Sequence, residues 1–270
     1  MKSIINFAIL LSALILSYVY IVIPTQKTVF QSPAAIKVFV IDTGINLNNR
    51  VFSDKRIKCA TKKDCNDYNG HGTSIASLIL NGQLDQFNEP TNPVCKDVEL
   101  EMCNYNHLAR SDDAYFTCLE RAAKAKPDVV NYSSVGSVPL VYEYLKIKEM
   151  TDNGTIYVVA TGNEGKKLFE SHTYPVMYLH LGKIKKPVKA SFLPYLDSPI
   201  KNIIPVAALN KDGTLWKESN TVDDMATEIG VNVRAATYAG FYHNVTGTSA
   251  AAALYTNKKL VELCNQRSKK

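Results

Sequence analysis

The sequence predicts an α/β fold in which a mostly parallel β-sheet is covered by helices on both faces. Short apolar runs rich in Val and Ile alternate along the chain with longer segments of helical character. The apolar runs contain few polar residues, which is typical of parallel strands that are buried on both faces. With 270 residues, of which 46% are hydrophobic and 21% charged, the chain is long enough for one large domain.

The expected fold begins with a strand at residues 36–41, because this run is apolar and β-branched. The turn Asp42-Thr43-Gly44 ends this strand. Residues 59–70 are polar and are expected to form a loop. A helix is expected at residues 71–80, and Asn81-Gly82 closes it.

The middle of the chain continues the alternation, with a strand expected at residues 97–103. Ser111-Asp112-Asp113 supplies an N-cap and an acidic first turn for a helix that ends before Pro127. The next apolar run, residues 128–133, is expected to be a strand, and residues 139–150 a helix.

The last expected strands are residues 155–160 and 203–209. Near the C-terminus, Gly247-Thr248-Ser249 leads directly into the alanine run 250–253. Alanine is the best helix former and lets a helix pack closely, so a buried helix is expected to begin near Ser249. Parallel sheets of this kind place their active sites at the carboxyl ends of the strands.

The N-terminus carries an apolar segment, residues 4–24, behind Lys2. We expect residues 1–24 to be a signal peptide or a membrane anchor. An uncleaved anchor is favoured, because a run of about 20 apolar residues can span a bilayer and no small-x-small cleavage site follows it. Residues 25–35 are then a linker, 36–264 the folded domain and 265–270 a basic tail, with the domain outside the cytoplasm.

The six cysteines are Cys59, Cys65, Cys95, Cys103, Cys118 and Cys264. An even number of cysteines behind an export signal suggests disulfides. Closeness in sequence favours the pairs Cys59–Cys65 and Cys95–Cys103. A zinc site is disfavoured, because the chain contains no Cys-x-x-Cys pair.

The net charge of +6 is mild, and Lys and Arg are scattered apart from one run at residues 183–189. A nucleic-acid partner is not expected, because such binding needs a broader basic patch.

The residues that can carry chemistry fall at the expected strand ends and helix starts. Asp42 follows the first strand, Asn163 follows the strand 155–160, and His71 and Ser249 begin helices. Acyl transfer needs a nucleophile, a base, a group that orients the base and a donor for the oxyanion. These four side chains supply one of each, in the order Asp, His, Ser along the chain.

The segments around these residues resemble those of the subtilisin-like serine peptidases, the subtilases. The resemblance rests on Val38-Phe39-Val40-Ile41-Asp42-Thr43-Gly44-Ile45, Asn69-Gly70-His71-Gly72-Thr73, Ala160-Thr161-Gly162-Asn163-Glu164-Gly165 and Gly247-Thr248-Ser249-Ala250. It implies a three-layer α/β/α sandwich and endopeptidase activity on extended peptides. It also implies that Asp42, His71 and Ser249 are catalytic, that Asn163 binds the oxyanion, and that structural calcium, with ligands unassigned, is common in such folds.

The same resemblance implies a peptide substrate that pairs with residues 130–136 as a strand. The substrate-binding residues it indicates are Ser133, Ser134, Val135, Gly136, Ala160, Thr161 and Gly162. The chain departs from the family pattern at Ala253, where proline is usual. In residues 131–136, either Val135 replaces a glycine of the pattern, which would narrow the first specificity pocket, or one residue is inserted. Neither an acidic nor an apolar pocket can be identified from the sequence.

The sequence also allows two alternative interpretations. Asp42-Thr43-Gly44 also resembles the active-site triplet of aspartic peptidases, but that mechanism needs two such aspartates and only one triplet is present. The other alternative is a non-catalytic subtilase-like scaffold that binds peptides at a surface assembly. Three departures from the family pattern motivate it: Ala253 in place of proline, residues 25–35, which are too few for the usual folding prodomain, and a reduced C-terminal segment.

Overall fold

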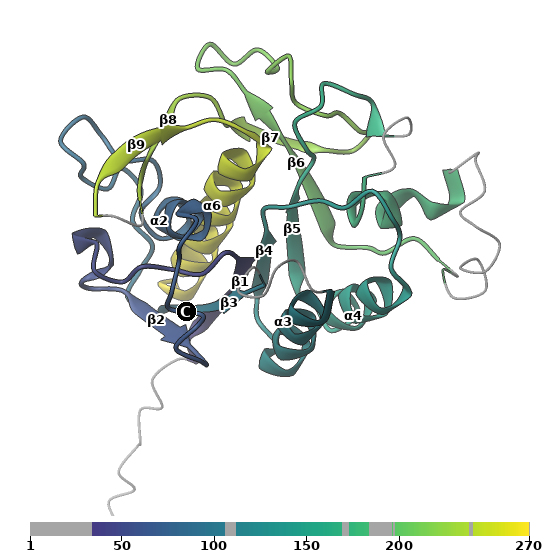
Figure 1. Cartoon of the computed structure of the whole chain (residues 1–270), viewed down its shortest axis with the longest axis horizontal. Coiled ribbons are helices and arrows are strands. Elements are labelled where there is room, and N and C mark those ends of the chain that lie inside the picture. The colour runs from purple at the N-terminus through teal and green to yellow at the C-terminus, as the bar shows by residue number, and fades with distance from the viewer. Residues whose placement is uncertain are drawn as a thin grey trace, which may run out of the picture. The chain divides into compact units, whose positions relative to one another are not determined.

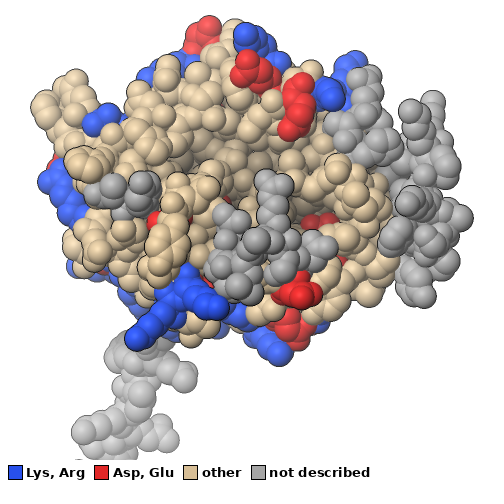
Figure 2. All heavy atoms as spheres, in the orientation of Figure 1, with Lys and Arg blue, Asp and Glu red and all other residues tan. Residues whose placement is uncertain are grey.

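The computed structural model describes residues 34–105, 112–168, 173–183, 196, 198–237 and 240–269 (Figure 1). The expected signal or anchor, residues 1–24, and most of the linker lie outside the described residues. Within the described part of the chain, no helix combines the length and apolarity needed to cross a bilayer. On the face seen in Figure 2, basic and acidic side chains both occur, and most of them lie toward the edge.

A seven-stranded sheet with the order β2-β3-β1-β4-β5-β6-β7 forms the middle of the fold, and all of its pairings are parallel. The central strands are the ones that the sequence predicts, because their apolar runs are buried on both faces. Their bounds are β1 (Ile36–Asp42), β3 (Val98–Asn104), β4 (Val129–Tyr132), β5 (Ile156–Ala160) and β6 (Ile203–Leu209).

The edge strands β2 (Arg56–Cys59) and β7 (Ala226–Ile229) were not expected. Both are four residues long and largely exposed or half-buried, so they lack the continuous apolar run that marks the central strands. A two-stranded antiparallel hairpin of β8 (Val233–Ala236) and β9 (Tyr242–Val245) lies outside the main sheet and packs against the helix that begins at His71.

Helices cover the sheet on both faces, which confirms the three-layer α/β/α sandwich. Figure 1 shows α2 (His71–Asn81) and α6 (Thr248–Arg267) on one side, and α3 (Asp112–Ala125) and α4 (Val141–Asp152) on the other. Strand β1 divides its side chains between the two faces. Val38 and Val40 pack with α2 and α6, whereas Phe39 and Ile41 pack with α3 and α4. Two short 3₁₀ segments, η1 (Arg50–Phe52) and η2 (Val176–Lys183), complete the described elements.

The alanine run of α6 is buried, as its composition predicts. Residues Ala250 to Ala253 are at most 2% exposed, and α6 packs on strands β4 to β7. The space is tight enough that a Cβ added to Gly230 would lie 2.6 Å from the Cβ of Ala208. Ala253, where the subtilase pattern has proline, lies inside a continuous helix.

The disulfides confirm one expected pair and correct the other. Cys59–Cys65 forms as expected, but the expected Cys95–Cys103 pair is wrong, because the bonds are Cys95–Cys264 and Cys103–Cys118. Cys103 packs with Cys118 in the core between the sheet and α3, whereas Cys95 packs against the opposite core beside α6. The sheet therefore separates the two cysteines that closeness in sequence suggested.

Candidate active site

The carboxyl edge of the parallel sheet gathers the residues that the sequence singles out. Strand β1 ends at Asp42, and β4 is followed by Ser133. Strand β5 is followed by Thr161-Gly162-Asn163, while α2 and α6 begin at His71 and Thr248. Segments that are far apart in the chain meet here because the strands are parallel and their carboxyl ends share one edge.

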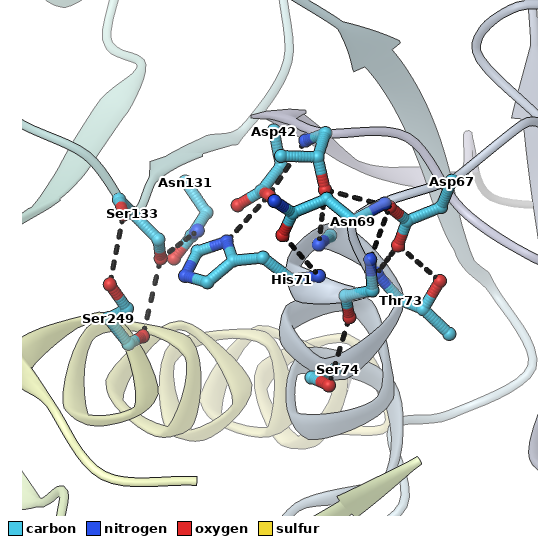
Figure 3. Close-up of polar contacts among 12 residues, drawn as sticks. Asp42, Asp67, Asn69, His71, Thr73, Ser74, Asn131, Ser133 and Ser249 are labelled. Atoms are coloured by element: carbon cyan, nitrogen blue, oxygen red, sulfur yellow. Dashed lines mark hydrogen bonds and ion pairs between the residues drawn. The ribbon is translucent and has the colours of Figure 1, made fainter. Parts of the chain in front are cut away.

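Asp42 and His71 are joined by a hydrogen bond. His71 Nδ1 lies 2.7 Å from Asp42 Oδ1, which also accepts the Thr43 backbone N–H at 2.7 Å (Figure 3). The Asp42 side chain is 2% exposed and that of His71 39%. With Nδ1–H donating a hydrogen bond to this carboxylate, the neutral imidazole carries its lone pair on Nε2. The negative charge of Asp42 raises the pKa of His71 above its ordinary value, and burial opposes this rise.

Glycine allows the turn after β1 to meet the start of α2. A Cβ on Gly72 would lie 2.1 Å from the carbonyl oxygen of Gly44, whose φ is +103°. No side chain fits in that space, so the glycines set the close approach of Asp42 and His71.

Asp67 is part of this site, and sequence reasoning missed it. Its buried carboxylate accepts the backbone N–H groups of Gly70 and Thr73, both at 2.8 Å, and the Thr43 hydroxyl at 2.9 Å. It therefore fastens the first turn of α2 to the turn after β1, on either side of His71. The available signal was an acidic residue just before a helix start, where the unpaired N–H groups favour negative charge.

Ser249 lies at the start of α6, with its hydroxyl turned away from His71. Its Oγ donates to the Ser133 carbonyl oxygen at 2.9 Å, and Ser133 Oγ donates to the Ser249 carbonyl oxygen at 3.3 Å. Figure 3 shows the His71 ring between Asp42 and this serine pair. Within the described residues, no hydrogen bond joins Ser249 to His71, although both side chains line one cavity of about 370 Å³.

Asn163 lines the same cavity and is held by the residue before Ser249. Its Oδ1 accepts both the Thr248 backbone N–H at 2.9 Å and the Thr248 hydroxyl at 3.0 Å. A backbone N–H can only donate, so this contact fixes which way the amide is turned. The Nδ2 donors are thereby left for a group in the cavity.

The residues expected to bind substrate separate into two sets. Ser133, Ser134, Val135 and Gly136 line a second cavity, which also has His71 in its wall. In contrast, Ala160 and Thr161 are at most 2% exposed, and Thr161 donates to interior carbonyl groups. The described residues that line the two cavities do not include Ala160, Thr161 or Gly162.

The backbone of Gly136 is already paired with Tyr174. Each donates its N–H to the carbonyl oxygen of the other at 2.9 Å. The part of residues 130–136 that could add a substrate strand therefore lies before Gly136.

The described residues contain no group of three or more His, Cys, Asp or Glu side chains placed to hold a metal ion. Ligands for the structural calcium that the resemblance implies stay unassigned.

A model of the subtilase family matches residues 34–258. The major intracellular serine protease of Bacillus subtilis is 28% identical over 155 residues, which are 53% of this chain and 48% of that protein. Subtilisin-like protease 2 of Trichophyton tonsurans is 25% identical over 131 residues, 47% of this chain and 31% of that protein. The matched region thus spans less than half the length of either curated relative.

Solved structures show the same fold at low sequence identity. The self-cleaved protease domain of PatA has a TM-score of 0.67 and 16% identity, covering 87% of this chain and 82% of that one. A cold-adapted subtilisin-like serine proteinase has a TM-score of 0.63 and 20% identity, covering 84% of this chain and 74% of that one.

Proposed function

The chain belongs to the subtilase family, and on this premise we propose that it is a serine endopeptidase acting on peptide or protein substrates. Ser249 is the nucleophile, His71 the general base and Asp42 the group that orients and stabilises the imidazole. The observation that carries the proposal is the 2.7 Å contact between Asp42 and His71, at a cavity that also holds Ser249 and Asn163.

The reaction begins with a rotation of the Ser249 side chain. Its Oγ leaves the Ser133 carbonyl and turns about the Cα–Cβ bond toward His71 Nε2; such rotations connect staggered rotamers. His71 then takes the hydroxyl proton as Oγ attacks the substrate carbonyl carbon, and Asp42 stabilises the imidazolium that forms. The same proton passes to the leaving amine. In the second half of the reaction, His71 takes a proton from the water that attacks the acyl-enzyme and returns it to Ser249 Oγ.

Asn163 supports the negative charge that develops on the carbonyl oxygen. Its Oδ1 is held by Thr248, so its Nδ2 donors need no reorganisation when the charge appears. The Ser249 backbone N–H, in the first turn of α6, has no partner within the helix and is the second donor. The helix dipole adds to this stabilisation.

We further propose that the domain works outside the cytoplasm, held at a membrane by residues 1–24 or released after their removal. The three disulfides support an oxidising compartment, because such bonds are rare in the cytosol.

A fluorophosphonate probe, which reacts with activated serines, tests the proposal on the full chain. The expected result is labelling of the wild type and its loss in Ser249→Ala and in His71→Ala. Ser53→Ala is the matched control, because Ser53 is exposed and lies at the C-terminal end of η1. Absence of labelling in a protein with a native circular dichroism spectrum and a cooperative unfolding transition contradicts the peptidase assignment.

One observation favours the peptide-binding scaffold as a second candidate. The Ser249 hydroxyl is bonded to Ser133 rather than to His71, so the nucleophile and base are not joined in this structure. The scaffold predicts a folded protein that binds peptides and stays unlabelled by the probe.

A further inference from the structure

The larger of the two cavities beside His71, about 580 Å³ in volume, is lined by aromatic and acidic residues as well as by the expected substrate strand. Residues 133–136 line it. Three tyrosines, Tyr105, Tyr115 and Tyr132, line it as well, together with Glu143. Its size falls in the usual range for ligand pockets. His71 lines both this cavity and the one that Ser249 lines.

Glu143 is a buried carboxylate that meets this cavity. It lies in the first turn of α4 and is 4% exposed. Its Oε1 accepts the Tyr115 hydroxyl at 2.5 Å, and its Oε2 accepts the Tyr178 hydroxyl at 2.7 Å. Among the described residues, no Lys or Arg forms an ion pair with it. Burial raises the pKa of Glu143 to about 7, whereas the two phenol hydrogen bonds act in the opposite direction.

Two phenol hydrogen bonds leave the carboxylate with unused capacity. Each carboxylate oxygen has two lone pairs, and each accepts one hydroxyl. An apolar side chain entering the cavity would leave the remaining lone pairs of Glu143 without a partner, which is unfavourable. A cation would instead satisfy the remaining lone pairs with charge-assisted hydrogen bonds.

The aromatic walls suit a cation for a separate reason. The Tyr115 and Tyr132 rings are stacked with centroids 5.1 Å apart, and Tyr105 meets each of them edge-on at 6.2 Å. Ring faces carry partial negative charge and attract ammonium or guanidinium groups, while the rings also pack on aliphatic stems.

We propose that this cavity binds a Lys or Arg side chain of the peptide substrate, with Glu143 as the acceptor. The proposal rests on the proposed function, because it takes the peptide to lie along residues 133–135 beside His71. Glu143 is thereby the residue that sets a preference for basic residues at one position of the substrate.

Equilibrium binding tests the proposal without relying on turnover. The protein is the full chain carrying Ser249→Ala, and the probes are fluorescent alanine hexapeptides with one arginine placed at each position in turn. Citrulline peptides are the matched probes, since citrulline has nearly the same shape as arginine without its charge. At one position, arginine is expected to bind at least about tenfold more tightly than citrulline, the lower end of what a hydrogen bond to a charged group contributes.

Substitution then locates the acceptor. Glu143→Gln, added to the same background, is expected to reduce the arginine-to-citrulline ratio to within about twofold. Glu149→Gln is the matched control on α4, because its side chain is half exposed and pairs with Lys146, and it should keep the ratio. Equal affinity for arginine and citrulline at every position overturns the proposal, as does a ratio that persists in a folded Glu143→Gln protein. The first of these comparisons needs no Glu143 variant, so it stands even where that variant fails to fold.

The two experiments distinguish failure of the basic-residue proposal from failure of the peptidase proposal. Fluorophosphonate labelling reports on Ser249 and needs no peptide in the cavity. Labelling without an arginine preference removes only the basic-residue proposal. An arginine preference without labelling leaves the cavity assignment in place and supports the peptide-binding scaffold.

Discussion

Replacing Glu143 by Gln should change how the stability of the folded domain depends on pH. The folded-state pKa of Glu143 is about 7, against an ordinary value of 4.5. The difference of about 2.5 pKa units corresponds to about 3 kcal/mol, at about 1.36 kcal/mol per unit. The group is almost completely buried, so solvent screening removes little of this energy.

The direction of the effect follows from proton binding. Below pH 4.5 the carboxyl group is protonated in both the folded and the unfolded chain. Between pH 4.5 and about 7 the unfolded chain releases this proton while the folded chain keeps it, so wild-type stability falls as pH rises. Above about pH 7 both states are ionised and the loss is complete. The facing hydroxyls stay neutral throughout, because their pKa values are all raised above the ordinary value: Tyr115, Tyr132, Tyr157, Tyr174 and Tyr178.

The measurement is urea unfolding from about pH 4 to pH 8.5, with Ser249→Ala as the background in order to prevent self-digestion. The free energy of unfolding of Ser249→Ala and of Ser249→Ala with Glu143→Gln is compared at each pH. Glutamine does not titrate, so other groups cancel and the variant should gain about 3 kcal/mol relative to its background across this range. A relative gain under about 1 kcal/mol would show that Glu143 is not an isolated buried carboxylate, which contradicts one premise of the cation-binding cavity.

Three further changes address the proposed site and the frame that holds it. Asn163→Ala should lower kcat about 10²–10³-fold with KM nearly unchanged, and a loss confined to KM would contradict an oxyanion role. In the wild type, kcat/KM should rise with pH as His71 loses its proton, with a midpoint above 6.5 because Asp42 raises the pKa of His71. In Asp42→Asn this midpoint should move to lower pH, and an unchanged midpoint would contradict the pairing of Asp42 with His71. Replacing Cys95 and Cys264 by serine should lower the free energy of unfolding, measured by urea denaturation, by up to about 5 kcal/mol. The reason is that the disulfide links residues 169 positions apart and so constrains a long loop of the unfolded chain; an unchanged free energy would show that the bond is absent.

The sequence predicts the parts of this fold that depend on local pattern. Continuous apolar runs predict the central strands, and nearby glycines at helix starts mark His71 and Ser249. The edge strands could not be found in this way, because half-exposed residues have no continuous pattern. The pairing of Cys95 with Cys264 depends on which face of the sheet each cysteine occupies, and that is a property of the assembled fold.

The site shows the same division. Motifs indicate Asp42, His71 and Ser249, but not the direction in which the Ser249 hydroxyl points, because a side-chain rotamer is set by neighbours such as the Ser133 carbonyl. Glu143 reads in the sequence as an ordinary acidic residue of a helical first turn. Only the packing of α3 and α4 against the sheet buries it among tyrosines and turns it toward a cavity.

The Cys95–Cys264 bond makes a closed covalent ring of the chain between these two residues. Asn163 and Ser249 lie on the ring, whereas Asp42 and His71 lie on the arm that precedes it. A single backbone cut at an exposed turn of the ring, such as that at Gly213, opens the circle but releases no fragment. A cut in the arm after His71 and before Cys95 leaves no disulfide between the two halves of the site. On a gel without reductant, a molecule cut within the ring therefore runs as one band, whereas a molecule cut between His71 and Cys95 separates into two. Only the second molecule can lose the part of the site that carries Asp42 and His71.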